Sequence, residues 1–450
     1  MIRYPDLQVG GIIDNGQSAW ARLDAHLPSD KSISHRLLLF AALCDQPVTI
    51  EDLNTGKAVA LLLEALIHLG VEVEHDPEQN KTALGSGLRG RPKCGVATVD
   101  LGPSSAAARL LIGVLVGLGV NCIVDGDETL RKRPFDWIFD PLIQMGGRLE
   151  YLGALGALPI RIFCGSFEGG AVRTRIGSAQ AVSALLFAGV AARRRVAIDY
   201  PVLARNHTQM MIASFGDKIE DANNRVSYTP GHFQMPSHVK VPKDPSAIAY
   251  IAALFWLINR DDPAATIELK YVCLNHTRLG FFEWMARCGF DLEIHQTYMT
   301  CGEPVGNLRL RGGGTLHAVG LKGKQAFHAM IDEIPLAVAI CCLLPGYATF
   351  HDLFELTFKE TDRIEATREM LSHLGLRVDV NGFDIHVPGG QTVRPQTDVS
   401  SFGDHRLSMT AHVVLLAHRQ SACVIEGGCY RTSFPNFGRC MDALLRRAAG

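Results

Sequence analysis

Residues 31–36 read Lys-Ser-Ile-Ser-His-Arg, and residues 37–44 continue as Leu-Leu-Leu-Phe-Ala-Ala-Leu-Cys. A short turn then leads to Val48-Thr49-Ile50. Polar residues directly ahead of an apolar run are typical of a helix start, and β-branched residues after a turn are typical of a strand. The stretch therefore predicts an apolar helix with a polar first turn, followed by a β-strand.

This order of polar opening, apolar run, turn and strand occurs six times along the chain. The openings lie roughly 66 to 88 residues apart, which is longer than the period of a typical solenoid repeat. Six α/β units are therefore predicted. The residues suited to binding or catalysis lie at the helix starts. The five later openings are Ser104 to Arg109, Ser178-Ala179-Gln180, Asp244-Pro245-Ser246, Asp332-Glu333 and Asp404-His405-Arg406.

Most units continue with a second helical segment that is closed by a glycine and followed by a strand. Glycine is the expected residue just past a helix end, because the chain there often takes a left-handed conformation. The pattern therefore predicts helix ends as well as strands. The glycines concerned are Gly70, Gly146, Gly216, Gly289 and Gly375.

A chain of 450 residues, 47% of them hydrophobic and 20% charged, can bury more than one core. Six units divide most simply into two groups of three. Turn-forming residues between Thr229 and Pro245, and again at Leu27 to Asp30, mark two crossings between the groups. We therefore predict a continuous domain of residues 29–242 and a discontinuous domain of residues 1–28 plus 243–450.

Composition excludes several classes of protein. No apolar run reaches about 18 residues, so no membrane span is expected, and the first residues do not resemble a signal peptide. A net charge of −2 gives no reason to expect nucleic acid as a partner. The 12 cysteines show no metal-ligand or disulfide spacing, which favours reduced thiols in a cytoplasmic protein and no metal site.

The polar openings are suited to binding anions. A helix N-terminus offers N–H groups and a partial positive charge, and arginine binds phosphate or carboxylate through two parallel hydrogen bonds. Any one basic residue could be a solvated helix-end residue. Together, however, five of them in short polar motifs predict a small ligand with several negative charges. They are Lys31, Arg36, Arg133, Arg363 and Arg406.

Two acidic residues lie near these basic residues in the motifs, Asp332 at a helix opening and Glu360 within Lys359-Glu360-Thr361-Asp362-Arg363. Either acid alone fits a helix N-cap or a first-turn residue. Two carboxylates in different environments can divide the roles of acid and base. Together with the basic residues they suggest proton transfer on an anionic substrate.

With these motifs the chain resembles the 5-enolpyruvylshikimate-3-phosphate synthase family. The three most specific segments are Asp30 to Arg36, Lys359 to Arg363 and Asp404 to Arg406, and the motifs run in the family's order from about residue 27 to 438. The other matching segments are Leu130 to Pro134, Ser178 to Gln180, Asn206 to Thr208, Asp332 to Pro335 and Ser433 to Pro435.

The resemblance implies an α/β fold of two domains, each with three βαβαββ repeats, and an active site in the cleft between them. It implies a monomer that transfers the enolpyruvyl group of phosphoenolpyruvate to shikimate 3-phosphate without metal or organic cofactor. By position, the catalytic residues would be Asp332, which accepts the hydroxyl proton, Glu360, which handles the proton at the methylene carbon, and Lys31, which contacts both substrates. Phosphoenolpyruvate would be held by Arg133, Gln180, Arg363, Arg406 and Ser105, and the acceptor by Ser32, Arg36, Ser178, Ala179, Gln180, Arg205, Asp332 and Lys359.

One segment departs from the family's pattern. Where relatives have a loop of the form G-N-[SA]-G-T, this chain has Gly102 to Arg109, with Pro103 removing an N–H donor and Ser105 replacing a glycine that would approach phosphate. We expect Ser105 to reshape this subsite and to make the protein tolerant of glyphosate, which occupies it in the family. Ala204, ahead of Arg205, and Asn206 also differ from the family's usual residues.

These departures leave three functions open. The first is a divergent shikimate-pathway synthase, favoured because the arginines, both acids and the acceptor residues are present. The second is a paralogue that acts on another acceptor, such as a nucleotide or a secondary-metabolite alcohol. The UDP-N-acetylglucosamine enzyme of that class is disfavoured, because residues 125–134 lack its cysteine loop. The third is a binding module without catalysis, supported only by the altered loop.

Overall fold

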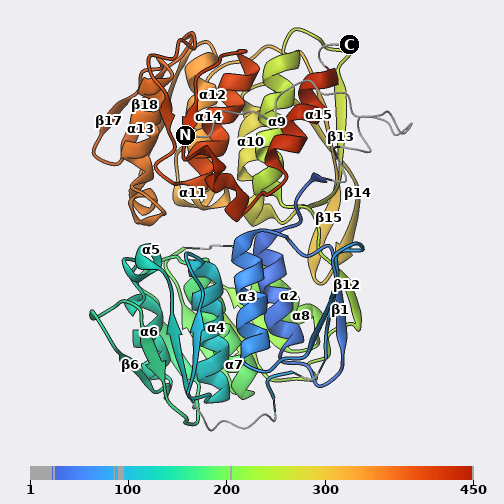
Figure 1. Cartoon of the computed structure of the whole chain (residues 1–450), viewed down its shortest axis with the longest axis vertical. Coiled ribbons are helices and arrows are strands. Elements are labelled where there is room, and N and C mark those ends of the chain that lie inside the picture. The colour runs from blue at the N-terminus through green and yellow to red at the C-terminus, as the bar shows by residue number, and fades with distance from the viewer. Residues whose placement is uncertain (1–22, 24–25, 86, 90–95, 203–204, 448–450) are drawn as a thin grey trace. The chain divides into compact units, whose positions relative to one another are not determined.

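The computed structural model describes residues 23, 26–85, 87–89, 96–202 and 205–447, and the chain divides into two units (Figure 1). Unit 1 contains the segment that ends at Pro28, Lys243–Tyr298 and the chain from Val305 onwards. Unit 2 contains Ser29–Pro242 and Met299–Pro304. The limits predicted from the sequence assign Met299–Pro304 to the other domain, because no change of composition marks this short segment.

Unit 2 is built on three four-stranded sheets that share one strand order. Each has an inner strand that pairs parallel with an edge strand and antiparallel with the other inner strand. The orders are β12-β1-β3-β2, β4-β5-β7-β6 and β8-β9-β11-β10, so the last strand of the unit completes the first sheet. The strands are β1 (Val48–Glu51), β2 (Val73–Asp76), β3 (Lys81–Leu84), β4 (Ala97–Asp100), β5 (Cys122–Asp125), β6 (Leu149–Tyr151), β7 (Ile160–Ile162), β8 (Gly170–Arg173), β9 (Val196–Asp199), β10 (Lys218–Ala222), β11 (Arg225–Thr229) and β12 (His238–Lys240).

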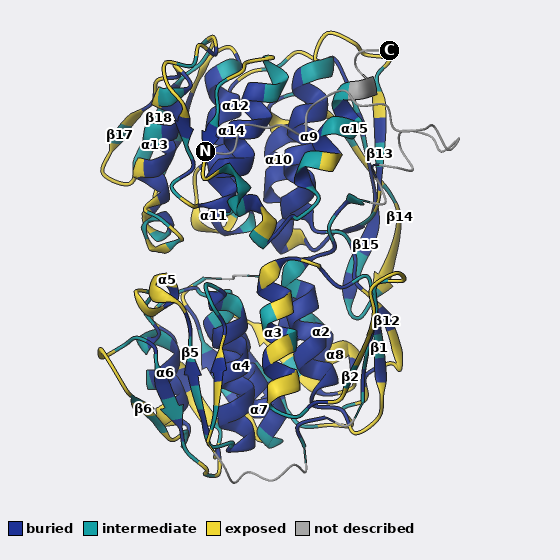
Figure 2. Ribbon diagram, viewed as in Figure 1, coloured by how far each residue is buried: buried dark blue, intermediate teal, exposed yellow. Residues whose placement is uncertain are grey.

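The three predicted apolar runs of unit 2 form the buried helices α2 (Lys31–Ala41), α4 (Ser105–Leu118) and α7 (Ala179–Ala192) (Figure 2). Helices α4 and α7 approach closely. A Cβ added at Gly113 would lie only 2.1 Å from the Ala184 carbonyl oxygen. Only glycine permits such an approach of two backbones. The remaining helices of the unit are α3 (Lys57–His68), α5 (Glu128–Arg131), α6 (Asp136–Gln144) and α8 (His207–Ser214).

Unit 1 repeats this plan with fewer strands. Its sheets are β13-β15-β14, β16-β18-β17 and the parallel pair β19-β20. In the first two, single parallel bridges at Lys243 and Leu321 take the place of an edge strand. The third repeat is the shortest within the described residues. The strands are β13 (Thr266–Cys273), β14 (Asp291–Thr300), β15 (Glu303–Arg311), β16 (Tyr347–Phe350), β17 (Asp379–Asn381), β18 (Asp384–Pro388), β19 (Val399–Ser400) and β20 (Val424–Ile425).

The apolar runs of unit 1 form three helices that are buried along almost their whole length, α9 (Pro245–Asn259), α12 (Ile334–Leu343) and α14 (His405–Ala417) (Figure 2). None of the helices in the described residues has both the length and the apolar character that crossing a bilayer requires. The other helical segments are α10 (Gly280–Arg287), α11 (Lys324–Ala329), α13 (Arg363–His373), α15 (Phe437–Arg447) and the 3₁₀ turns η1 (His276–Arg278), η2 (Phe354–Phe358) and η3 (Gly427–Thr432).

The prediction that glycine closes the second helix of most units is confirmed. All five glycines follow a helix and have positive φ angles, from 75° at Gly375 to 100° at Gly289. A residue with a Cβ is strained in this conformation, so glycine lets the chain turn from helix into strand.

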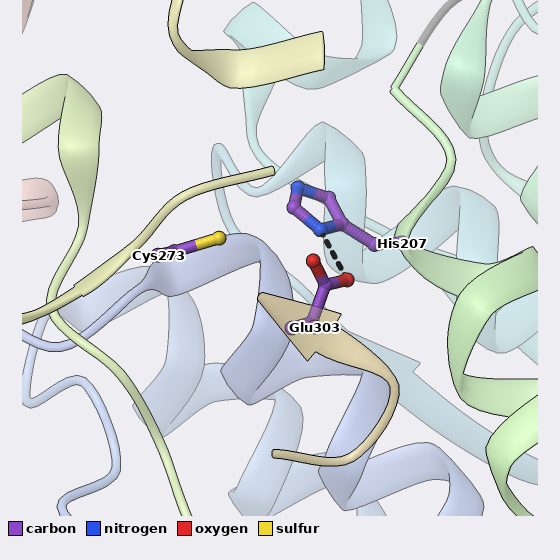
Figure 3. A group of neighbouring side chains, drawn as sticks. All are labelled: His207, Cys273 and Glu303. Carbon is purple, nitrogen blue, oxygen red and sulfur yellow. Dashed lines mark hydrogen bonds and ion pairs between the residues drawn. The ribbon is translucent and has the colours of Figure 1, made fainter. Parts of the chain in front are cut away.

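The β14–β15 hairpin begins in unit 1, and its tip, Met299–Pro304, belongs to unit 2. At the tip, a Cβ on Gly302 would lie 2.3 Å from the Met210 carbonyl oxygen of α8. Figure 3 shows the adjacent pair, in which His207 Nδ1 lies 2.7 Å from Glu303 Oε1 and both side chains are fully buried. Cys273, also labelled there, belongs to unit 1. The hairpin tip is therefore fastened to α8 by close backbone packing and a buried polar contact.

Candidate active site

Groups from the first two turns of α2, α7 and α8 surround the guanidinium group of Arg36. Its Nε donates to Thr208 Oγ1 at 2.8 Å, Nη2 to Ser183 Oγ at 2.9 Å, and Nη1 to the Ser32 carbonyl oxygen at 2.8 Å. Arg36 is only 4% exposed. Arg36 therefore ties three helix starts of unit 2 together, a role that the sequence did not indicate.

The altered loop ends at the start of α4, where the backbone N–H of Ser105 donates to the Pro103 carbonyl oxygen at 3.0 Å. The Ser105 hydroxyl donates to Gln180 Oε1 at 3.3 Å, and Arg109 Nη1 donates to the same oxygen at 2.7 Å. The Ser105 side chain therefore lies beside Gln180, which the sequence also assigns to the phosphoenolpyruvate site. Arg109 had no assigned role, and its only sequence signal is its place in the second opening.

The other candidate residues of unit 2 lie at or near helix starts with partly exposed side chains. Lys31 and Ser32 begin α2, and Ser178 caps α7 by accepting from the Ala181 N–H at 3.4 Å. Ala179 follows the cap, Arg205 lies two residues ahead of α8, and Arg133 follows α5. Ala204 lies outside the described residues.

In unit 1, one buried arginine gathers three carboxylates. Arg363 is 1% exposed, and its Nε donates to Asp404 Oδ2 at 2.7 Å. Its Nη2 donates to Glu360 Oε2 at 2.5 Å, and its Nη1 donates to Asp332 Oδ1 at 3.2 Å. The motifs at residues 332, 360–363 and 404 are therefore brought together around a single guanidinium group.

Neither of the two candidate acids caps a helix. Asp362 caps α13 by accepting from the Ile364 N–H at 3.1 Å, and Glu333 occupies the cap position of α12. Asp332 and Glu360 instead face Arg363, with side chains that are 17% and 31% exposed. Both carboxylates are therefore available for proton transfer beside a fixed positive charge.

Further cations surround Asp332. Lys359 Nζ lies 3.9 Å from Asp332 Oδ1, and Arg406 Nη2 lies 3.9 Å from Asp332 Oδ2. Arg406 is 5% exposed, and its Nη1 donates to the Ser246 carbonyl oxygen of α9 at 3.3 Å. The five residues that the sequence predicts for this part of the site therefore lie within one cluster: Asp332, Lys359, Glu360, Arg363 and Arg406.

Burial by itself would lower the pKa of these two arginines. It opposes the charge of Arg363, but Asp404, Glu360 and Asp332 raise its pKa well above the ordinary value. Burial likewise opposes the charge of Arg406, whose pKa is raised chiefly by Asp332. The cluster therefore holds two permanent positive charges on buried side chains, beside partly exposed carboxylates.

The sequence motifs indicate no role for two residues that lie in or beside this cluster. Asp404 is fully buried. It caps α14 by accepting from the Arg406 N–H at 2.8 Å, and it also binds Arg363. Arg278 is 3% exposed and its Nη2 donates to Asp244 Oδ1 at 2.8 Å and Ser246 Oγ at 3.0 Å, which fixes the start of α9. Asp404 belongs to the motif Asp404 to Arg406, whereas nothing in the sequence marks Arg278.

His35, in the first motif, makes stability depend on pH. Its ring is buried, Nε2 lies 3.1 Å from the Ala58 carbonyl oxygen, and burial, aided by Lys31 and Arg36, lowers its pKa to about 3. The unfolded chain, with an ordinary pKa near 6.5, therefore binds more protons between pH 6.5 and 3. The contribution of His35 to stability is therefore full above about pH 6.5 and is lost progressively as the pH falls from 6.5 toward 3.

We expect the change His35→Gln to reduce this acid sensitivity. Between pH 7 and pH 5 the wild-type chain should lose about 2 kcal/mol of unfolding free energy through His35, and the variant should not. Urea unfolding at the two pH values, followed by circular dichroism, measures the difference. His232→Gln, at an exposed histidine of the same unit, is the control. Equal losses in wild type and His35→Gln would contradict the prediction.

Comparisons with known proteins agree with the motifs. A family model described as EPSP synthase (3-phosphoshikimate 1-carboxyvinyltransferase) matches residues 21–441. The 3-phosphoshikimate 1-carboxyvinyltransferase of Granulibacter bethesdensis is 33% identical over 452 residues, which cover 96% of each chain. That of Bacillus pumilus is 29% identical and covers 94% of this chain and 96% of its own.

Solved structures show the same similarity. The EPSP synthase from Acinetobacter baumannii superposes with a TM-score of 0.79 and 27% identity over 94% of each chain. The enolpyruvyl transferase NikO from Streptomyces tendae has a TM-score of 0.71 at 15% identity over 93% of each chain, which is a similarity of fold alone. The predicted two-domain enolpyruvyl transferase fold is confirmed, and the chain belongs to the EPSP synthase family.

Proposed function

We propose that this chain transfers the enolpyruvyl group of phosphoenolpyruvate to shikimate 3-phosphate and releases phosphate. The family and the names of its relatives support a transferase of the shikimate pathway. Within the structure, the observation that supports the proposal most strongly is the set of three carboxylates around Arg363. It combines fixed positive charge for an anionic substrate with two partly exposed acids for proton transfer.

In this proposal, unit 1 supplies the acid and base groups. The acceptor's hydroxyl oxygen bonds to C2 of phosphoenolpyruvate while Asp332 takes the hydroxyl proton and Glu360 gives a proton to the methylene carbon C3. The bond between C2 and the phosphate oxygen then breaks, Glu360 takes a proton back from C3, and the proton held by Asp332 leaves with phosphate. Fixed charges beside such a tetrahedral intermediate are often the largest contribution to the rate.

The cations of unit 1 hold the substrates in this scheme. Arg363 and Arg406 bind phosphoenolpyruvate, and Lys359 contacts the acceptor. Three carboxylates already fix Arg363, and Arg406 donates to the Ser246 carbonyl oxygen, so both guanidinium groups need little reorganisation when the substrate arrives.

Unit 2 supplies the remaining contacts. Lys31 touches both substrates, Arg133, Gln180 and Ser105 bind phosphoenolpyruvate, and Gln180 also touches the acceptor. The partly exposed side chains of Lys31, Arg133 and Gln180 support these assignments, whereas Ser105 is only 6% exposed and lies beside Gln180. Arg36 is also buried, at 4% exposed, and three of its nitrogens donate within the unit. The proposed acceptor contacts of unit 2 are Ser32, Arg36, Ser178, Ala179 and Arg205.

Phosphate release from phosphoenolpyruvate by the purified chain tests the function. Release that requires shikimate 3-phosphate is the expected result. Absence of release with this acceptor, from protein shown to be folded, would contradict it, and release with another alcohol would then identify a paralogue. The monomeric state and the cytoplasmic location stay predictions, to be measured by light scattering and by fractionation.

A further inference from the structure

The side-chain amide of Gln180 is held by two residues of a neighbouring helix. Gln180 is the second residue of α7, and its Oε1 accepts from Arg109 Nη1 at 2.7 Å and from Ser105 Oγ at 3.3 Å. Both donors lie on the first turns of α4. The amide is thus bridged to residues 71 and 75 positions earlier in the chain.

The chemistry of arginine decides which end of the amide faces Arg109. A guanidinium group has N–H donors and no acceptor, so the atom 2.7 Å from Arg109 Nη1 must be the amide oxygen. A serine hydroxyl can then donate to the same oxygen. The amide nitrogen must point to the opposite side, and its two N–H groups remain for a ligand.

Arg109 is well suited to this role because it is itself fixed. It is 7% exposed, and its Nη2 donates to the Pro134 carbonyl oxygen at 2.8 Å. Its guanidinium carbon lies 5.0 Å from the ring centre of Phe135 and 5.2 Å from that of Trp137. Stacking on aromatic rings and two hydrogen bonds leave the group little freedom to rotate.

We propose that Arg109 and Ser105 are positioning residues that lock the Gln180 amide with its nitrogen toward the substrate. A locked –NH2 donates to phosphate or carboxylate oxygens of phosphoenolpyruvate, whereas a flipped amide would present an oxygen and repel them. This inference rests on the proposed function of the same site. It also gives Ser105 a new part in binding, because a glycine at this position has no hydroxyl to donate.

Steady-state kinetics with phosphoenolpyruvate as the varied substrate test the lock. Gln180→Glu keeps the contact with Arg109 but offers oxygen to the substrate, so KM should rise at least about 30-fold with an unchanged melting temperature. Arg109→Met should raise KM about 10-fold or more, and Arg109→Lys, which can still donate, should recover part of the loss. Ser105→Ala should raise KM about 3-fold, as expected for one neutral hydrogen bond.

In all four variants kcat should change by less than about twofold, because the interaction is made equally in the ground and transition states. Two controls at exposed positions of α13 repeat the changes in residue type. Ser372→Ala matches Ser105→Ala, and Arg368→Lys matches Arg109→Lys. They should leave both constants unchanged.

A double-mutant cycle separates action through Gln180 from a structural role. In a Gln180→Ala background, Ser105→Ala and Arg109→Met should no longer change KM for phosphoenolpyruvate beyond about twofold. Effects of full size in that background would overturn the inference, since they would then act through Pro134 or through folding. A wild-type chain without phosphate release would instead contradict the proposed function, so the two failures are distinct.

Discussion

Replacement of Glu360 by glutamine is expected to lower the rate of phosphate release about 1,000-fold, the size typical of a lost general acid and base. Glutamine has the shape of glutamate, and its carbonyl oxygen can still accept from Arg363 Nη2, which lies 2.5 Å from the native carboxylate. The amide cannot give or take the proton at C3. We therefore expect kcat to fall while KM for phosphoenolpyruvate stays within about threefold.

The matched control is Glu365→Gln, which neutralises an exposed carboxylate in the first turn of α13 that pairs with Arg368. It should change kcat by less than about twofold, as is usual for an exposed ion pair. A Glu360→Gln enzyme that keeps more than a tenth of the wild-type kcat would show that Glu360 does not carry the proton.

Replacement of Arg363 by lysine is expected to damage both stability and turnover. One ammonium group cannot reproduce contacts with carboxylates that three separate guanidinium nitrogens now bind. Asp404 is fully buried, so loss of its partner leaves an under-compensated charge and should lower the free energy of unfolding by about 3 kcal/mol. The value of kcat/KM for phosphoenolpyruvate should fall about 1,000-fold.

A second substitution distinguishes the two effects. Asp404→Asn removes the buried charge, so the double variant Arg363→Lys with Asp404→Asn should regain part of the lost stability in urea unfolding. It should not regain activity, because lysine still lacks the planar pair of donors. Arg368→Lys, on the exposed side of α13, is the control for the change itself. Activity restored together with stability would show that Arg363 serves the fold alone.

Local patterns were sufficient to predict most of the architecture. Helix starts such as those at Lys31 and His405 follow from a capping aspartate and an apolar run, and glycines such as Gly70 follow from the need for positive φ. These rules act within a few residues of the chain. The same locality explains why the sequence missed the hairpin tip at Met299–Pro304, whose assignment to unit 2 depends on packing against a distant helix.

The sequence by itself determined the six repeats, the family motifs and the chemical types of the site residues, because each of these is written in short segments. Only the tertiary structure decided which groups meet. Arg363 binds carboxylates that lie 31 and 41 residues away, and Gln180 is held by residues of another helix. Such contacts depend on how separate helices pack and on which buried charges must be compensated, and no periodicity in the sequence encodes these pairings.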